Sequence, residues 1–175
     1  MTQSIPINLA GLAVFLEGLN QQVATGDVTL PTLTPMTDTV NGAGILGDVE
    51  VPSSGHYSSM QVGIAWKTIN KDVFKLVSSQ MKGLEIRGAF KEFDNTRGVT
   101  VTKAIKIVVR GFGKGVELGT LVQNAASNTS NTIEVTYIKI FIDGTSVFEL
   151  DKFNYVSRVN GEDDMADIRK ALGLA

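Results

Sequence analysis

The sequence contains no cysteine and a single histidine, His56. The absence of cysteine excludes disulfides, thiolate metal sites and cysteine nucleophiles. A Ser-His-Asp triad or a histidine-rich metal site would have to be built around His56 alone. Aromatic residues make up only 7% of the chain, and the net charge is −2. Nucleic-acid-binding domains are usually strongly basic, so this composition argues against a general nucleic-acid binder and against a base-stacking platform.

Charged residues are also scarce, at 19% of the chain, and the mean hydropathy is slightly positive at +0.11. A typical soluble domain has about 25% charged residues. A chain with few charges and a mildly apolar average often covers much of its surface with other subunits. The length of 175 residues fits a single domain, which we place over residues 1–175.

Long hydrophobic runs are missing as well, since no stretch reaches the roughly 18 uninterrupted apolar residues of a membrane helix. The apolar stretch 5–19 lacks the positive leader of a signal peptide, because the first basic residue of the chain is Lys67. We therefore expect the protein to be made and folded in a cytoplasm. Residues 1–66 carry five acidic residues and no Lys or Arg, whereas residues 67–175 carry all 16 basic residues and the other 13 of the 18 acidic residues. This asymmetry fits either head-to-tail stacking of acidic on basic faces or ordinary scatter.

Alternation of apolar and polar residues predicts strands over 60–68, 84–91 and 99–110, with a turn at 94–98. A second hairpin is predicted from 133–142 and 147–156 around Asp143-Gly144, because this dipeptide favours the tight hairpin turn. The strand 133–142 is apolar on both faces and should lie against protein on both sides. Shorter strands are expected at 13–17 and 23–30. The predicted fold is mainly antiparallel β, a sandwich or partly open barrel.

Two helices and two long loops complete the predicted architecture. One helix should span 71–82 with an apolar stripe of Val73, Phe74, Val77 and Met81, and should begin at Asn70 or Asp72. The other should be short and C-terminal, over 163–172, with acidic residues at its start and basic residues near its end. Residues 123–132 read as a polar hairpin tip. Residues 32–57 read as a loop that is too long for a structureless connection and should be functional or ordered by a neighbour.

Four groups of residues resemble the sequence motifs of functional sites but lack the flanking structure, spacing or free side chains that those sites need. Residues 42–47 read GxGxxG, but no strand precedes them and no helix follows, so loop chemistry is the better interpretation. The run GFGKG at 111–115 lacks a Walker pattern and fits a strand end or bulge. The acids at 162–167 lack the ligand spacing of a calcium loop. Glu149 and Asp151 could form an acid–base pair, but Lys139 and Lys152 suggest cross-strand pairing instead. We expect no enzyme activity, no metal and no cofactor.

Several segments, in order, resemble the major tail tube protein of contractile-tailed bacteriophages. The strand AVFLEG is followed by VTLPTLTPMTDTVNGAGILGDVEVP at 28–52, which has the family's V-x-L-P-x-L stretch and a later Gly-Ala-Gly. Further on come IVVRG at 107–111, TYIKIFIDGTSVFELDKFNYVSRVNGEDDM at 136–165, and a closing helix that ends in ALGL. The segment 67–104 matches in pattern more than in letters, and the Asn/Ser/Thr-rich insert at 115–132 departs from the family.

The resemblance implies a structural subunit that forms six-fold rings, stacked into a tube inside a contractile sheath. Strands of neighbouring subunits would join into one β-barrel around a lumen used by the tape-measure protein and the genome, with no specific DNA binding. Expected partners are other copies, the sheath and the baseplate, in the host cytoplasm during assembly and then in the virion tail. A phage-tail-like bacteriocin or another contractile injection system would share this fold, and a monomeric β-sandwich binding module is the alternative from a different class.

Two sets of residues are expected to make the assembly contacts. Ring or stacking contacts are placed on Val28, Thr29, Leu30, Pro31, Gly42, Ala43, Gly44 and Gly47. The shared barrel is placed on the strands 84–91 and 99–110, with Leu84, Ile86, Phe90, Ile105, Ile107 and Val109.

Overall fold

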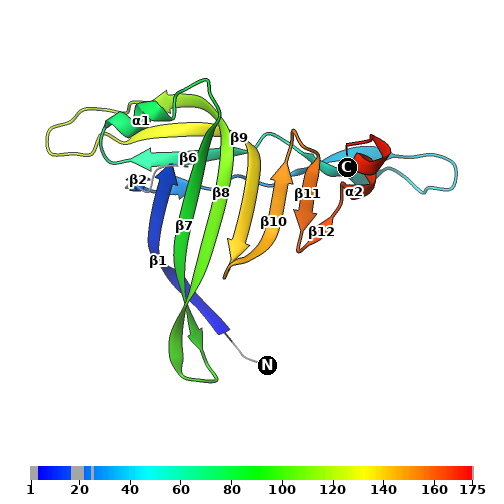
Figure 1. The fold of residues 1–175 in the computed structure, drawn as a ribbon, viewed down its shortest axis with the longest axis horizontal. Coiled ribbons are helices and arrows are strands. Elements are labelled where there is room, and N and C mark those ends of the chain that lie inside the picture. The colour runs from blue at the N-terminus through cyan, green and yellow to red at the C-terminus, as the bar shows by residue number, and fades with distance from the viewer. Residues whose placement is uncertain (1–3, 17–21, 25, 175) are drawn as a thin grey trace.

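A computed structural model of the chain describes residues 4–16, 22–24 and 26–174 (Figure 1). The elements in chain order are β1 (Ser4–Leu16), β2 (Gln22–Ala24), β3 (Val28–Thr29), β4 (Pro35–Val40), β5 (Val49–Tyr57), β6 (Gln61–Trp66), α1 (Lys71–Lys75), β7 (Lys82–Asp94), β8 (Val99–Glu117), β9 (Thr129–Ile142), β10 (Thr145–Asp151), β11 (Val156–Val159), β12 (Glu162–Asp163) and α2 (Ala166–Ala171). Residue 17 of the predicted strand 13–17 and residue 25 of the predicted strand 23–30 lie outside the described residues. Within 23–30, residues 23 and 24 belong to β2 and residues 28 and 29 form β3, whereas residues 26, 27 and 30 lie outside any strand, so the one predicted strand is divided in two.

One large sheet has the strand order β12-β11-β10-β9-β8-β7-β1-β2, and neighbouring strands along this order pair antiparallel in the described part of the chain. β6 pairs with the first half of β9, and β3 pairs with β6. β4 and β5 form a separate two-stranded hairpin. The expected mainly antiparallel β fold, with one helix between strands and a short C-terminal helix, is confirmed.

The large sheet bends over on itself because β8 and β9 are long and change direction part-way. The register of β8 against β9 shifts between Arg110 and Gly111 and again between Gly113 and Gly115. A Cβ atom at Gly111 would lie 2.0 Å from the carbonyl oxygen of Glu134, so only glycine allows the two backbones to come this close. The GFGKG run is therefore a bulged part of a strand, as predicted. The bend carries β6 across one face of β1, β7 and β8.

We call this covered face of β1, β7, β8 and β9 the core face. The side chains of β6 that point toward it are almost completely buried, which confirms the strand predicted at 60–68. The buried hydrophobic residues that fill the core are Val14, Met60, Val62, Ile64, Trp66, Val73, Leu76, Leu84, Ile86, Ile107, Val109, Ile133, Val135, Ile138 and Leu150. The indole N–H of Trp66 donates to the side-chain oxygen of Asn131 at 2.8 Å, and the Asn131 amide donates to the Val73 carbonyl at 3.2 Å. This chain of bonds ties β6, β9 and α1 together.

The helix predicted over 71–82 is wrong in length and in the face it buries. The Asn70 side chain caps it as predicted, accepting from the backbone N–H groups of Asp72 and Val73 at 3.0 and 3.1 Å. The helix then stops at Lys75. Shortly after, the Ser78 hydroxyl accepts from the Gln80 N–H, a local turn that competes with helical bonding.

The residues of this segment that are buried differ from the predicted apolar stripe. Val73 and Leu76 are buried, whereas Phe74, Val77 and Met81 are exposed. The stripe therefore does not pack into this chain's own core.

The Asp143-Gly144 turn is confirmed, with φ of 48° and 82° at its two central residues. The strand predicted over 147–156 is instead interrupted. The Asp151 carboxylate accepts from the backbone N–H groups of Phe153 and Asn154 at 3.0 and 3.1 Å, which folds the chain into a turn. β10 and β11 therefore form their own short hairpin. The C-terminal helix is also shorter than predicted, because Asp163 belongs to β12 and α2 begins at Ala166.

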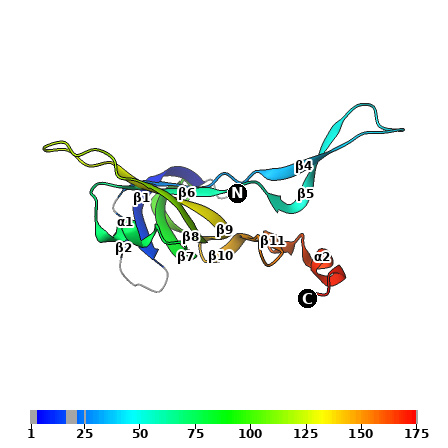
Figure 2. The ribbon, with the colours of Figure 1, turned by 90° about the horizontal axis from the view of Figure 1, so that it is seen from above.

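Both predicted loops contain strand. Residues 129–132 belong to β9, so the irregular part of the β8–β9 connection ends before Thr129. The predicted loop 32–57 contains a hairpin of β4 and β5, and only residues 32–34 and 41–48 of it lie outside strands. Figure 2 shows this hairpin projecting from the body at the end that also carries α2, while the β8–β9 connection projects at the opposite end.

Candidate assembly surfaces

No group of three or more His, Cys, Asp and Glu side chains that could hold a metal ion occurs among the residues that the structure describes. Within the same residues, no helix is long and apolar enough to cross a membrane. His56 lies in β5, and the GxGxxG letters lie between β4 and β5. The surfaces that stand out are instead an extended hairpin and an apolar groove.

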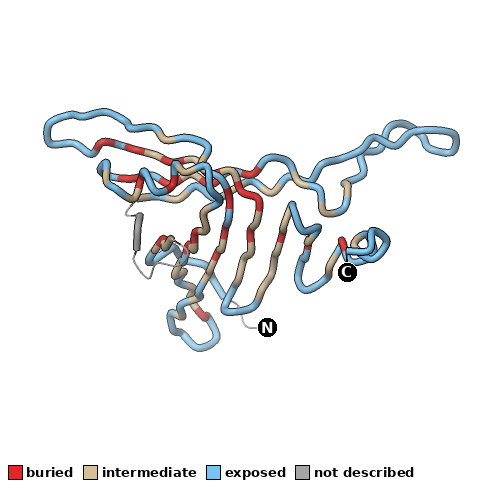
Figure 3. Tube along the Cα trace, turned by 45° about the horizontal axis from the view of Figure 1, so that its top comes forward, coloured by how far each residue is buried: buried red, intermediate tan, exposed pale blue. Residues whose placement is uncertain are grey.

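The hairpin of residues 35–57, called the arm below, leaves nearly all of its residues in solvent. Every residue from 34 to 52 is exposed (Figure 3). Its strands pair from Pro35 with Tyr57 to Val40 with Val49. Exposed apolar side chains nevertheless follow its length, namely Met36, Val40, Ile45, Leu46, Val49 and Val51. Leu46 at the tip has a relative exposure of 107%.

Short polar contacts keep the arm ordered. The Asn41 amide donates to the Asp48 carboxylate at 3.0 Å, and the Ser53 hydroxyl donates to the Asp38 carboxylate at 3.0 Å. The Ile45 N–H donates to the Gly42 carbonyl at 3.1 Å, which closes a turn at the tip. Burial of the arm within its own chain therefore does not explain why it holds its shape.

The base of the arm is fixed to the C-terminal part of the chain. Gly55 has φ of +70°, and a Cβ atom there would lie 2.3 Å from the sulfur of Met165, which is buried. The Lys152 ammonium donates to the Ser58 carbonyl at 2.8 Å, so Lys152 bonds to the backbone rather than to the cross-strand carboxylate expected from the sequence. These contacts set the direction in which the arm leaves the body.

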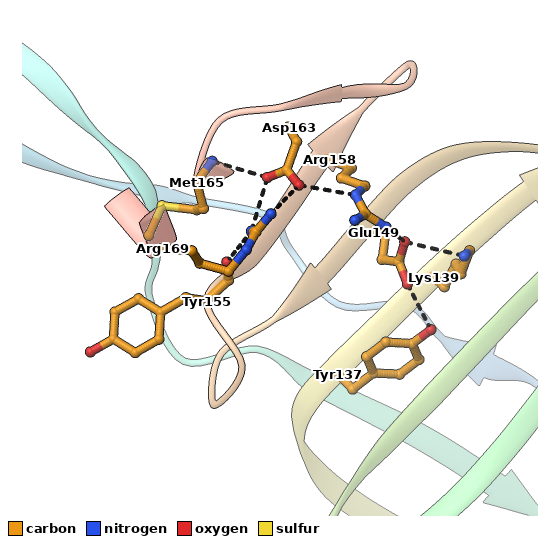
Figure 4. A network of polar contacts seen from close by, with 8 residues as sticks. All are labelled: Tyr137, Lys139, Glu149, Tyr155, Arg158, Asp163, Met165 and Arg169. Atoms are coloured by element: carbon orange, nitrogen blue, oxygen red, sulfur yellow. Dashed lines mark hydrogen bonds and ion pairs between the residues drawn. The ribbon is translucent and has the colours of Figure 1, made fainter. Parts of the chain in front are cut away.

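A network of charged side chains holds β10, β11, β12 and α2 together (Figure 4). Arg169 from α2 binds the Asp163 carboxylate at 2.7 and 3.2 Å and donates to the Tyr155 carbonyl at 2.6 Å. Arg158 lies between two carboxylates, at 3.1 Å from Asp163 and 3.3 Å from Glu149. The hydrogen bond from Arg169, followed by that from the Met165 N–H, lowers the pKa of Asp163 to about 2.

Glu149 completes the network and has no free carboxylate for acid–base chemistry. It accepts from Lys139 at 3.1 Å, as predicted, and from the Tyr137 hydroxyl at 3.2 Å. Burial, and then the charge of Glu149, raises the pKa of Tyr137. Asp151 is used in the turn after β10. The paired carboxylates considered from the sequence are therefore structural.

The face of the sheet opposite the core face carries most of the basic side chains of the long strands, and we call it the charged face. These cations lie on aromatic rings. Arg87 stacks on Phe15 at 4.9 Å, Lys106 on Phe141 at 4.4 Å, and Arg110 on Tyr137 at 5.4 Å from the ring centroids. Arg87 also bonds to Glu85. An open trough of about 630 Å³ is lined by Arg87 and Lys106 and otherwise by Gly, Ala and larger apolar residues.

The core face is not covered along its whole length. Beside β3, which pairs with β6, it opens into a groove with a volume of about 310 Å³ whose lining includes no charged residue. The groove, so named below, is lined by Leu9, Leu12, Val28, Leu30, Ile86, Gly88, Phe90, Ile105, Ile107, Ile140 and Ile142. Its rim is accessible to solvent, since Leu9, Leu30 and Ile142 have relative exposures of 43%, 49% and 39%.

The structure separates the predicted contact residues into three places. Gly42, Ala43, Gly44 and Gly47 lie at the tip of the arm. Val28 and Thr29 form β3, and Leu30 and Pro31 follow it, so that Val28 and Leu30 line the groove. Leu84, Ile86, Ile107 and Val109 are buried in the chain's own core, and Ile86 and Ile107 also line the groove together with Phe90 and Ile105.

The groove itself was missed, because its other walls come from β1 and β9. For these two walls the sequence offered only separate signals, namely the apolar residues Leu9 and Leu12 ahead of the strand predicted at 13–17, and Ile140 and Ile142 in the strand predicted at 133–142.

Trp66, the only tryptophan, is 1% exposed and hydrogen-bonded. It therefore provides no exposed stacking surface for a glycan, which the alternative of a β-sandwich binding module would favour.

Comparison with known proteins agrees with this picture of a structural subunit. The family model of the phage tail tube protein FII matches residues 6–173. The chain is 26% identical over 175 residues to the tail tube protein of Escherichia phage P2, covering 98% of this chain and 99% of that protein. It is 23% identical to the major tail tube protein of Serratia phage KSP20, with 98% of each chain covered.

A solved structure is also similar in fold. It comes from an extracellular contractile injection system, described as the PVC sheath/tube terminator in the extended state. The TM-score is 0.56 at 13% identity, over 78% of this chain and 96% of that chain. The resemblance to tail tube proteins of contractile-tailed bacteriophages is confirmed, and the chain is a structural protein and not an enzyme. It belongs to the phage tail tube protein FII family.

Proposed function

We propose that this tail tube subunit forms hexameric rings that stack into the inner tube of a contractile tail, with residues 1–175 acting as one domain. The single observation that carries the proposal is the large amount of ordered apolar surface that the chain leaves in solvent, on the arm and around the groove. Monomeric proteins rarely expose contiguous apolar surface of this kind. Head-to-tail contact between unlike surfaces closes into a ring when the rotation permits, and rings can then stack without limit.

The sheet supports the shared-barrel part of the proposal. β7 and β8, which carry Leu84, Ile86, Phe90, Ile105, Ile107 and Val109, lie in the middle of the sheet and would form the centre of each subunit's share of the barrel. Among the described residues, β2 covers the outer edge of β1 only at Val14 and Phe15. The remaining edge of β1, with Ile5 and Ile7 exposed, would join the neighbouring subunit, which removes an edge otherwise open to aggregation.

Contacts within and between rings would use Val28, Thr29, Leu30 and Pro31 beside the groove and Gly42, Ala43, Gly44 and Gly47 at the tip of the arm. The assembled tube would associate with the sheath and the baseplate and enclose the tape-measure protein, and DNA would pass without specific binding. Assembly would take place in the cytoplasm of the bacterial host before the tube becomes part of the virion tail. The two phage relatives favour a phage tail over a bacteriocin or another injection system, which would use the same subunit without a genome.

The proposal is tested by negative-stain electron microscopy of the purified protein over a range of concentrations, with the mass in solution measured on the same samples. We expect rings or tubes with a central channel. A matched variant replaces residues 41–48 by Asn-Gly, because Val40 and Val49 are paired and a two-residue turn can join them. This variant should remain folded and lose the tubes. A wild-type protein with the mass of one subunit at every concentration would contradict the proposal.

A further inference from the structure

The arm and the groove are two apolar surfaces of one chain that cannot meet within that chain. The two views in Figures 1 and 2 place the end of the arm beyond α2, whereas β1 and β7, which form one wall of the groove, lie toward the other end of the molecule. The base of the arm is held in this direction by the packing of Gly55 on Met165 and by the bond from Lys152 to the Ser58 carbonyl. Contact between arm and groove therefore requires a second copy.

We propose that the groove receives the tip of the arm of a neighbouring copy, with Ile45 and Leu46 inserted against Leu9, Leu30 and Ile142. This inference deepens the proposed function and rests on it, because it names the surface that receives the arm. The volume of the groove suits this occupant. A dry cavity of about 150 Å³ lined by Leu, Ile and Phe accommodates a benzene molecule. The groove, at about 310 Å³ and with a similar lining, has room for two aliphatic side chains of that size.

The chemistry of the two surfaces also matches. The arm presents apolar side chains on an exposed hairpin, and the groove presents apolar side chains with no charged group in its lining. The trough on the charged face is the competing receptor, since residues 35–57 contain the acids Asp38, Asp48 and Glu50 and no Lys or Arg. Its bordering cations, however, already have partners. Arg87 bonds to Glu85 and stacks on Phe15, and Lys106 stacks on Phe141.

The experiment uses the absence of natural cysteine, so that any disulfide reports only introduced thiols. Leu46→Cys is combined in turn with Leu9→Cys, Leu30→Cys and Ile142→Cys in the full chain. The matched control combines Leu46→Cys with Thr102→Cys, because Thr102 is exposed and pairs with Lys91 on the charged face. Each protein is oxidised and separated by non-reducing gel electrophoresis, and the same samples are viewed by electron microscopy.

We expect at least one groove pair to give a reducible ladder that extends beyond dimers, because each chain then carries one donor and one acceptor position. Proximity in the assembly should make that ladder about tenfold or more stronger than that of the Thr102 pair. Leu46→Cys alone can give no species larger than a dimer.

Tubes without a ladder from any groove pair would overturn the inference while leaving the proposed function intact. The same conclusion would follow from a ladder with Thr102 alone, or from a disulfide formed within one chain. A wild-type protein that forms neither rings nor tubes, together with double-cysteine variants that form no ladder, would sink both proposals.

Discussion

Replacing Asn131 by leucine should destabilise the subunit more than any change to its exposed surface. The Asn131 side chain is 1% exposed, accepts from the Trp66 indole at 2.8 Å and donates to the Val73 carbonyl at 3.2 Å. Leucine has a similar size but can form neither bond. Each buried polar group left without its partner costs about 1–3 kcal/mol. The two groups together cost about 2–6 kcal/mol and the greater hydrophobicity of leucine returns about 1–2 kcal/mol, so we expect a net loss of about 1–4 kcal/mol in the free energy of unfolding.

The measurement is urea unfolding followed by tryptophan fluorescence, because Trp66 is the only tryptophan and is buried at the affected site. The protein is kept dilute enough that its mass in solution is that of one subunit, since assembly would add to the apparent stability. The matched control is Ser130→Ala, at the next position of β9. The Ser130 hydroxyl makes only a 3.5 Å exposed contact with Glu117, so its loss should change the free energy by no more than about 0.5 kcal/mol. If Asn131→Leu stays within about 1 kcal/mol of wild type, the bonds that link β6, β9 and α1 contribute little to the stability of the subunit, contrary to this expectation.

Three further changes test other parts of the structure. Gly55→Ala should lower the free energy of unfolding by about 1–2 kcal/mol because of the positive φ at this position, and the clash of the new Cβ atom with the Met165 side chain should lower it further. Met165→Ala should remove the clash, so urea unfolding of the double variant should show only the cost of the backbone angle on top of that of Met165→Ala. Asp163 has a folded-state pKa lowered to about 2, so its contribution to stability is present above about pH 4 and is lost as the pH falls toward 2; an Asp163→Asn variant whose stability falls equally steeply over that range would contradict the assignment. Ultraviolet titration should find the pKa of Tyr137 above its usual range, and Glu149→Gln should bring the pKa of Tyr137 down.

The sequence predicted the strands best where one face meets the core of the same chain. The alternation through Val62, Ile64 and Trp66 reflects burial beneath the chain's own sheet, so local periodicity and tertiary contact agree. The stripe Val73, Phe74, Val77 and Met81 shows the opposite case. Its spacing is helical, but most of it is exposed and the helix ends early. Apolar residues that a subunit keeps for other contacts, or leaves in solvent, give the same pattern as core residues, and the sequence of one chain cannot separate them.

The groove could not be predicted because no continuous stretch of the sequence contains it. Its walls depend on the register that places Leu9 beside Phe90 and Ile105 beside Ile142 across separate ladders. The register in turn depends on bulges in β1 and on the bend in β8 near Gly111. The arm was found as a segment of unusual length, but its strand pairing was missed. Its apolar residues alternate with acids, Thr and Pro over only a few positions, and the pattern alone does not set a hairpin apart from a loop.

The lack of basic residues in the first 66 positions has a consequence for how copies meet. Three acidic residues lie on the arm, and none of its residues is Lys or Arg. Two arms that approach each other therefore carry like charges, which disfavours arm-to-arm pairing even though both surfaces are apolar. The groove has no charged residue in its lining and imposes no such repulsion. Charge thus discriminates between two apolar contacts of otherwise similar chemistry and favours the unlike pair. Only the unlike pair leaves a free arm at one end and a free groove at the other, which is what a closing ring or a growing stack requires.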